Sequence, residues 1–239
     1  MGFETAMLQK PAKNIMRVDM HCHTMYSGDS VTLLYELEEA FIQSGVDVLC
    51  ICDHGTIQGA KVLHEKLSQV DGEKVDKVII GEEYSTSQGE LIGLFLKERI
   101  TPGLSPLEVA LAIKAQGGLV YVPHPFDAAR RCLKLESMTE LAEAGLLDIV
   151  EVFNSKVSDE SARTNALDFA EKWHLAQGAG SDAHVPQAVG AAYVEMPVVM
   201  TVTPASFLRS VKEGHVVGRY CDPPRQWRSK VVPSLSSLQ

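Results

Sequence analysis

The chain has 239 residues, of which 45% are hydrophobic and 22% charged, as expected for one barrel-sized α/β domain or two smaller domains. Its 22 basic and 31 acidic residues give a formal net charge of −9. This charge disfavours a broad nucleic-acid-binding face, because such a face is basic. No apolar run approaches the roughly 20 residues of a membrane span, and no signal peptide is apparent. We therefore expect a cytoplasmic protein with reduced cysteines.

Strand-like and helix-like segments alternate along the chain. A polar lead-in over residues 1–15 precedes a domain over residues 16–220, and a tail rich in Pro and Ser occupies residues 221–239. Strands are predicted over residues 16–20, 46–52, 77–84, 91–96, 118–122, 147–153, 176–180, 191–196 and 215–219. Helices are predicted over residues 32–44, 57–69, 105–116, 158–173 and 204–213. This alternation favours a single parallel α/β domain, either a closed barrel or an open sheet.

Local signals mark several helix ends. Gly45 is a usual stop for the first helix, and Ser105-Pro106 and Thr203-Pro204 resemble an N-cap followed by a first-turn proline. No glycine-rich loop of the G-x-G-x-x-G or G-x-x-x-x-G-K type follows the first strand. A dinucleotide site or a P-loop therefore has little support.

Histidines and carboxylates follow the ends of six predicted strands. The first of these strands ends at His21 and His23, behind which lies Asp19. The other five end at Asp53-His54, at Glu82-Glu83, at His124, at Glu151 with Asn154, and at Asp182 with His184. In a parallel barrel such ends meet on one face, where functional sites are built. Residues i and i+2 of a strand point the same way, so the Asp19 carboxylate can orient one of the two imidazoles.

This pattern predicts a metal site. Imidazole and carboxylate ligands without thiolate suit Zn²⁺, Mn²⁺ or Fe. The candidates exceed the four ligands of a single tetrahedral ion, so we expect two or three divalent ions, an arrangement that clamps both attacking and leaving oxygens. His64, His174 and His215 fall within helices or at the start of a strand, and we expect no role for them in the site.

Six motifs together resemble the PHP family, named for its polymerase and histidinol phosphatase domains. They are DMHCHTMYSGDS from residue 19, CDHG from 52, GEEYS from 81, PHPFD from 123, EVFN from 151 and GSDAH from 180. The resemblance runs from residue 17 to about residue 190, in the family's order. It implies a distorted (β/α)₇ barrel, two or three divalent metal ions and phosphoester hydrolysis.

The resemblance also implies roles by position. His21, His23 and Asp182 look like ligands of a first metal, and Glu83, rather than Glu82, matches a bridging glutamate. The remaining implied ligands are His54 and Asp29 at a second metal, and His124 and His184 at the other position or positions. Asp53 and His184 are the expected catalytic residues, with Asp53 supporting the site rather than binding metal.

The chain departs from the family at three places, and the first is that Asp29, preceded by Gly28, falls one position later than the corresponding acid of some relatives. Glu90 stands about where several relatives have a histidine, and it can either bind metal or face solvent. Lys156 stands where an arginine is common. The candidates for binding substrate phosphate are Arg130, Arg131, Asn154 and Lys156, although each cation can equally be a solvated surface residue.

The expected activity is hydrolysis of phosphomonoesters of small metabolites or short nucleotides by metal-activated water. The expected partner is a small phosphorylated substrate, and neither a membrane nor an extended nucleic acid is expected. The alternatives are a PHP-type exonuclease or nucleotide phosphodiesterase, a metal-dependent amidase or deaminase, and a non-catalytic metal-binding subunit module. The absence of a G-x-S-x-G motif disfavours acyl-enzyme chemistry.

Overall fold

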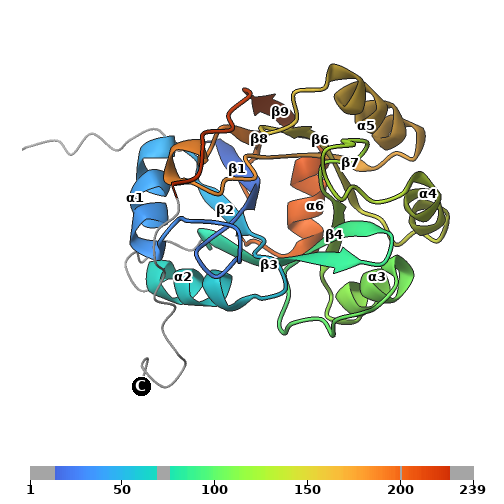
Figure 1. Ribbon diagram of the computed structural model, residues 1–239, viewed down its shortest axis with the longest axis horizontal. Helices are drawn as coiled ribbons and strands as arrows, with labels where there is room; N and C mark the ends of the chain where they lie inside the picture. The colour runs from blue at the N-terminus through green and yellow to red at the C-terminus, as the bar shows by residue number, and fades with distance from the viewer. Residues whose placement is uncertain (1–13, 69–75, 200, 227–239) are drawn as a thin grey trace, which may run out of the picture.

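The computed structural model describes residues 14–68, 76–199 and 201–226 (Figure 1). The predicted lead-in before residue 14 and the tail beyond residue 226 lie outside the described residues. The strands are β1 (Ile15–Cys22), β2 (Val48–Ile51), β3 (Val78–Thr86), β4 (Gly89–Leu94), β5 (Leu119–Val122), β6 (Ile149–Asn154), β7 (Ala176–Gly180), β8 (Ala192–Pro197) and β9 (His215–Gly218). The helices are α1 (Leu34–Ser44), α2 (Gln58–Ser68), α3 (Pro106–Ala115), α4 (Leu135–Glu143), α5 (Glu160–Lys172) and α6 (Pro204–Lys212), with a short 3₁₀ helix, η1 (Pro186–Ala188).

The strands form one mixed sheet in the order β7-β6-β5-β4-β3-β2-β1-β8-β9. The expectation of a purely parallel sheet is wrong, because β4 is antiparallel to β3 and β5, and β8 is antiparallel to β1 and β9. Only Ser87 and Gln88 connect β3 to β4, which leaves no room for the crossover that a parallel pair requires. The pairs β1–β2, β2–β3, β5–β6 and β6–β7 are parallel, and each is separated by a helix, of which the one between β5 and β6 was not predicted.

The sheet curls into a nearly closed barrel, which confirms the predicted fold class. The chain after β7 pairs with the end of β1: the backbone N–H of Asp182 donates to the carbonyl of His21 at 2.7 Å, and that of His23 donates to the carbonyl of Ala183 at 3.1 Å. Figure 1 shows the strands arranged around α6, with α1, α2, α3, α4 and α5 outside them. The carboxyl-terminal ends of β1 and β7 therefore lie side by side.

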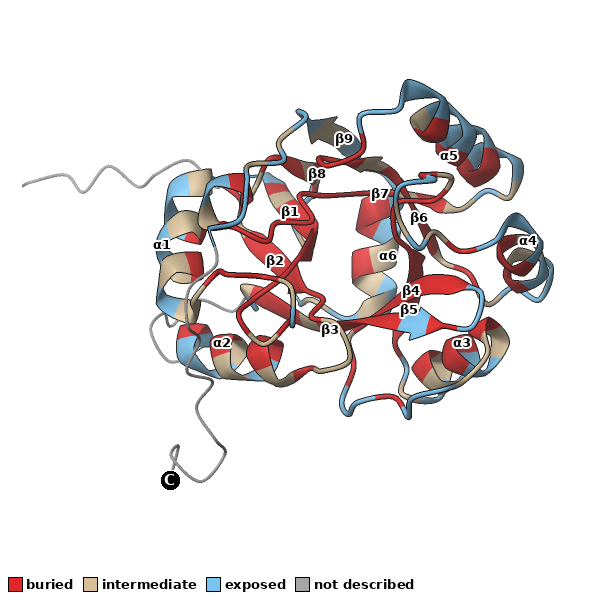
Figure 2. Cartoon of the chain, in the orientation of Figure 1, coloured by how far each residue is buried: buried red, intermediate tan, exposed pale blue. Residues whose placement is uncertain are grey.

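The hydrophobic core has an inner and an outer part. Side chains inside the ring, such as Met20 and Tyr121, pack with Phe207 of α6. Phe207 also lies edge-on to Phe95, which follows β4, with ring centroids 5.3 Å apart. Because β4 runs antiparallel, this contact places α6 at the end of the barrel opposite the carboxyl ends of β1 and β7. Outside the ring, helices bury their inner faces against the strands and expose their outer faces (Figure 2).

Most local signals hold in the structure. Gly45 adopts a left-handed conformation (φ 75°) at the end of α1, and Ser105 and Thr203 accept N-cap hydrogen bonds at α3 and α6. Helix α4 was not predicted, and its N-cap residue, Lys134, makes no side-chain cap. All five cysteines are free. Among the described residues, no helix combines the length and the apolar character needed to cross a membrane.

Candidate metal centre

The eight predicted metal residues come together at one end of the barrel. They are His21 and His23 at the end of β1, Asp29 in the following loop, His54 after β2, Glu83 in β3, His124 after β5, and Asp182 and His184 after β7. All of them are buried except Asp29 and His54, which are partly exposed. The strand ends thus concentrate ionisable groups in a space that is shielded from water.

Glu83 lies at the centre of this arrangement. Its Oε2 atom is 3.2 Å from Nε2 of His21, 3.3 Å from Nε2 of His23 and 3.6 Å from Nδ1 of His54. Its Oε1 atom is 3.0 Å from Nε2 of His124. A carboxylate that faces four imidazoles in this way can bridge neighbouring cations, which is the role implied for Glu83 by position.

The ligand atoms form three overlapping groups. The inner group is His21, His23 and Asp182; the lateral group is His54, Glu83 and Glu90; the outer group is His23, Asp29, His54 and His184. Within each group the ligand atoms lie within 4.8 Å of one another. Glu90 is 7% exposed and faces this centre rather than solvent. Imidazole and carboxylate donors without thiolate fit Zn²⁺, Mn²⁺ or Fe.

Two observations fit the presence of cations. Nε2 of His21 and Nε2 of His23 lie 3.0 Å apart and face the same Glu83 oxygen. In addition, Nδ1 of His23 and Nδ1 of His124 are buried without a hydrogen-bond partner among the described residues. Buried polar atoms of this kind are rare because they cost free energy. A cation in the inner group would be a shared partner for the converging nitrogens of His21 and His23, whereas His124 belongs to none of the three groups.

The charges at the centre are strongly coupled. Burial raises the pKa of Glu83 and Asp182, but the neighbouring cations, His21 for Glu83 and Lys156 for Asp182, outweigh it and hold both pKa values well below the usual range. Burial and the charge of His184 lower the pKa of His23 to about 4. His23 is therefore neutral at pH 7, the form that binds metal.

Glu151 is a site residue that the sequence reasoning did not assign. Its Oε1 atom lies 3.1 Å from Nδ1 of His21 and accepts a hydrogen bond from the Tyr121 hydroxyl at 2.9 Å. Its Oε2 atom accepts from the backbone N–H of His124 at 2.6 Å and from the Asn154 amide at 3.0 Å. Glu151 thus orients one predicted ligand and fixes the backbone of another.

The orienting role expected of Asp19 therefore belongs to Glu151, and that expectation is corrected. Asp19 is buried and accepts backbone hydrogen bonds from His21 at 3.3 Å, Ser181 at 2.9 Å and Gly190 at 3.0 Å. It holds the chain segments after β1, β7 and η1 in register. The available signal was the position of Glu151 at the end of a buried strand, but only the fold shows which imidazole it faces.

Asp53 lies apart from the three groups. It accepts hydrogen bonds from the backbone N–H of Thr24 at 2.6 Å and from the Thr24 hydroxyl at 2.7 Å. Burial raises the pKa of Asp53 to about 6. These contacts position the loop that begins at His23, which matches the supporting role expected for Asp53.

The four predicted substrate-binding residues separate in the structure. Lys156 is buried, with Nζ 3.1 Å from Oδ1 of Asp182 and 2.6 Å from Nδ1 of His184. Arg130 reaches the same aspartate, with Nη1 3.5 Å from Oδ2. Asn154 donates to Glu151 and, at 3.3 Å, to Asp182. Arg131 instead donates its guanidinium N–H to the carbonyl of Thr86 at 3.3 Å, and no ion pair of Arg131 with Asp182 is present among the described residues.

Comparison with known proteins identifies the family. The PHP domain model matches residues 19–172. The chain belongs to the PHP family. A second model, of a PHP-associated segment, matches residues 160–216.

Among relatives of this PHP protein, an uncharacterized protein of Methanocaldococcus jannaschii is 36% identical over 182 residues, which are 75% of this chain and 70% of that protein. A Bacteroides vulgatus structure is described as a two-domain protein containing a predicted PHP-like metal-dependent phosphoesterase. It matches with a TM-score of 0.70 at 15% identity, over 86% of this chain and 65% of that one. A lesion-specific endonuclease of Pyrococcus furiosus matches with a TM-score of 0.56 at 17% identity, over 83% of this chain and 56% of that one. The two structures share the fold.

Two predicted ligands of this PHP barrel have unusual backbone geometry. His124 (φ 29°) and Asp182 (φ 49°) lie in the left-handed region. Non-glycine residues there cost about 1–3 kcal/mol and persist where surrounding contacts enforce them. Those contacts include the bond from His124 N–H to Glu151 and the bond from Asp182 N–H to His21.

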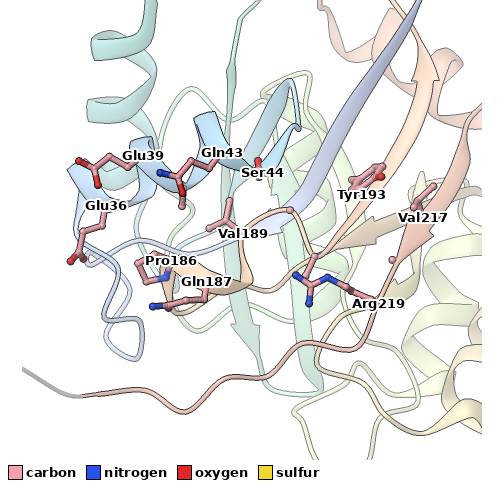
Figure 3. A pocket seen from close by; sticks show the side chains of 14 residues that line it. Glu36, Glu39, Gln43, Ser44, Pro186, Gln187, Val189, Tyr193, Val217 and Arg219 are labelled. Atoms are coloured by element: carbon pink, nitrogen blue, oxygen red, sulfur yellow. The ribbon is translucent and has the colours of Figure 1, made fainter.

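A hollow of ≈ 880 Å³ lies beside the PHP site, between α1 and the β8–β9 pair (Figure 3). Glu36, Glu39, Gln43, Tyr193 and Arg219 are among its lining residues. None of the predicted metal residues lines it. The metal centre is thus distinct from this hollow.

Proposed function

We propose that this PHP protein hydrolyses phosphomonoesters of small metabolites or short nucleotides, with two or three divalent ions in its three ligand groups. The observation that carries the proposal is the convergence on Asp182, whose Oδ1 atom faces His21, His23 and Lys156 and whose Oδ2 atom faces Arg130. Hydrolysis of a phosphate ester would need both bound divalent ions and fixed positive charge. The imidazoles that would hold the ions and the side chains that supply the charge both contact this carboxylate.

Different side chains of the site would have different roles in the hydrolysis. The imidazoles and carboxylates of the three groups would hold divalent ions, which when bound polarise phosphate oxygens and make water a better nucleophile near neutral pH. Lys156 and Arg130 would orient the phosphate and offset its charge in the transition state. Glu151 would keep the Nδ1 proton on His21, so that Nε2 is free to bind. Asp53 would act as a positioning residue through Thr24.

His184 has a more complex environment. Nε2 lies 2.7 Å from Oδ2 of Asp29, and Nδ1 lies close to Asp182 and to Nζ of Lys156. Burial lowers the pKa of His184, but hydrogen bonds with Asp182 and Asp29 outweigh it and raise the pKa above its usual value. We propose that His184 binds a cation through Nε2 while its Nδ1–H donates to the backbone carbonyl of Asp182, 2.8 Å away, which fixes the orientation of the ring.

The net charge of −9 supports a small substrate over an extended polyanion, because the surrounding surface would repel the latter. A nuclease remains the second candidate, since an endonuclease shares the fold. A non-catalytic module is disfavoured because all eight predicted ligands are present and lie at the same end of the barrel.

The test is a substrate screen on metal-stripped protein reloaded with Mn²⁺, Zn²⁺ or Fe²⁺. Phosphate release from sugar phosphates and mononucleotides is compared with degradation of a single-stranded oligonucleotide and with ammonia release from amides. Asp182→Ala should abolish turnover, whereas Glu143→Gln, an exposed change on α4, should not. Degradation of the oligonucleotide without cleavage of any small monoester would replace the proposal with a nuclease, and ammonia release alone would replace it with an amidase.

A further inference from the structure

The chain after β9 returns to the metal centre. Residues 219–226, called here the tail segment, have no regular secondary structure and run from β9 towards α1 (Figure 1). The backbone N–H of Arg219 donates to the carbonyl of Ala191 at 2.9 Å, and that of Cys221 donates to the carbonyl of Ser155 at 2.8 Å. The second bond ties the tail segment directly beside Lys156. The tail segment is thus fixed to the body at the edge of the site.

Arg225 extends from this segment to the outer ligand group. Its Nη1 atom donates to the carbonyl of Asp29 at 3.0 Å and lies 3.6 Å from Oδ2 of the same residue. That Oδ2 atom is 2.7 Å from Nε2 of His184 and 3.7 Å from Nε2 of His54. The Arg225 side chain is 36% exposed, so it borders both the outer group and solvent.

The geometry points to Arg225 as a binding residue for the substrate's phosphate, an inference that rests on the proposed function. A cation held by the outer group would take up the charge of Asp29. The guanidinium would then keep its own charge at the rim, with Nε and Nη2 available beyond the Nη1 contact. A planar guanidinium matches two phosphate oxygens at once. Arg130 and Lys156 supply positive charge at Asp182, and Arg225 supplies it at Asp29.

The tail segment also shapes the space next to Arg225. A groove of ≈ 620 Å³ lies between Pro223 and Pro224 on one side and Val31 and Val185 on the other. Val185 directly follows His184 in the chain, and Arg225 lies between two lining residues, Pro224 and Gln226. The volume of the groove is in the range of small-molecule sites. The non-phosphate part of a small substrate would fit there while Arg225 holds the phosphate.

The competing explanation is that Arg225 only neutralises Asp29 and competes with the cation. The two explanations differ for Arg225→Ala. If Arg225 binds phosphate, inorganic phosphate should bind the Mn²⁺-loaded variant about 10- to 100-fold more weakly, as for loss of a charge-assisted hydrogen bond, with unchanged Mn²⁺ content. If it only neutralises Asp29, Mn²⁺ should bind more tightly and phosphate affinity should be unchanged, which would overturn the inference.

Calorimetric titration of Mn²⁺-loaded protein with inorganic phosphate, together with elemental analysis, decides between them. Arg225→Lys keeps a single positive charge but loses the planar guanidinium that can bind two phosphate oxygens. Its phosphate affinity should therefore lie between those of wild type and Arg225→Ala. Arg219→Ala, on the same segment, is the matched control and should leave phosphate affinity unchanged. Equal phosphate affinity in wild type and Arg225→Ala, or no phosphate binding by wild type, would refute the inference.

This readout needs no turnover and therefore separates the two proposals. Arg225-dependent phosphate binding without hydrolysis of any monoester would refute the proposed activity and leave the Arg225 site standing. Monoester hydrolysis with the same KM in wild type and Arg225→Ala would refute the Arg225 site and support the proposed activity.

Discussion

Oε1 of Glu151 lies 3.1 Å from Nδ1 of His21, although the two residues are 130 positions apart in the chain. The same carboxylate accepts hydrogen bonds from Tyr121, His124 and Asn154, so both of its oxygens face donors. An ionised carboxylate is the only side chain of this length that offers acceptors in all these directions. Its role is to present Nε2 of His21 to the metal centre.

Glu151→Gln should weaken metal binding at the inner group by about 10–100-fold, because an amide would turn N–H donors towards groups that already donate. The measurement is the Mn²⁺ or Zn²⁺ dissociation constant, with circular dichroism to show that the fold is retained. Glu143→Gln on the exposed face of α4 is the control. Wild-type metal affinity in Glu151→Gln would show that His21 is oriented by other contacts.

Glu83→Gln should reduce metal content and kcat/KM far more than Glu82→Gln. Glu83 faces four imidazoles, whereas Glu82 accepts a hydrogen bond from the backbone N–H of Ile100 at 3.3 Å and pairs with Arg99. Adjacent strand residues point to opposite faces, so only one can enter the centre. Elemental analysis and steady-state kinetics on both variants test this. Similar, mild effects from the two changes would contradict the bridging role.

Arg130→Ala should raise KM for a phosphomonoester, whereas Arg131→Ala should leave KM near the wild-type value. Arg130 lies 3.5 Å from Asp182, but Arg131 donates to the Thr86 carbonyl at the end of β3. Loss of a charge-assisted phosphate contact is worth about 1.5–3 kcal/mol. The kinetics should be measured with the thermal midpoint of each variant, since Arg131→Ala is expected to lower stability slightly. An unchanged KM in Arg130→Ala would leave Lys156 as the cation to test next.

Metal affinity should increase with pH between about pH 6 and pH 9. Burial lowers the pKa of His54, but the hydrogen bond with Asp29 and the charge of Glu83 outweigh it and raise the pKa to about 9. In the metal-free protein His54 is therefore protonated at pH 7 and must lose its proton to bind. Each proton released makes apparent affinity rise about tenfold per pH unit, until the pH passes the pKa.

Calorimetry of Mn²⁺ binding in two buffers of different ionisation enthalpy counts the released protons. His54→Asn should release fewer protons than wild type. His23 offers the internal contrast, because its pKa of about 4 means that it has no proton to lose at pH 7. Buffer-independent binding enthalpy would show that the centre is already deprotonated.

The local sequence predicted where helices begin and end better than it predicted whether neighbouring strands are parallel or antiparallel. Gly45, Ser105 and Thr203 mark helix ends through their own backbone preferences and caps, so the ends of α1, α3 and α6 lie within two residues of those predicted. Helix α4 lacks such a cap at Lys134 and was missed. The antiparallel course of β4 follows from its short connection to β3, a signal that hydrophobic patterning alone does not include.

The part of the site that could be predicted consists of His, Asp and Glu residues at the carboxyl ends of strands. The convergence of strand ends predicted that His21, His23 and Asp182 would lie on one face of the barrel, whereas their grouping around one metal came from the resemblance to the PHP family. The choice between Asp19 and Glu151, or between Arg130 and Arg131, depends on distances that only the folded chain sets. Arg225 falls within the predicted tail over residues 221–239, and nothing in its neighbouring residues indicates its contact with Asp29.

The bonds that close the barrel join the metal residues themselves, because Asp182 N–H donates to the carbonyl of His21 and His23 N–H donates to that of Ala183. Ions held by these side chains would link the end of β1 to the chain after β7. Loss of metal should then let these two segments separate locally. Hydrogen exchange at the amides of His23 and Asp182 should become faster, and proteolytic cleavage nearby should occur earlier. The supply of divalent ions would thereby set the lifetime of the protein as well as its activity.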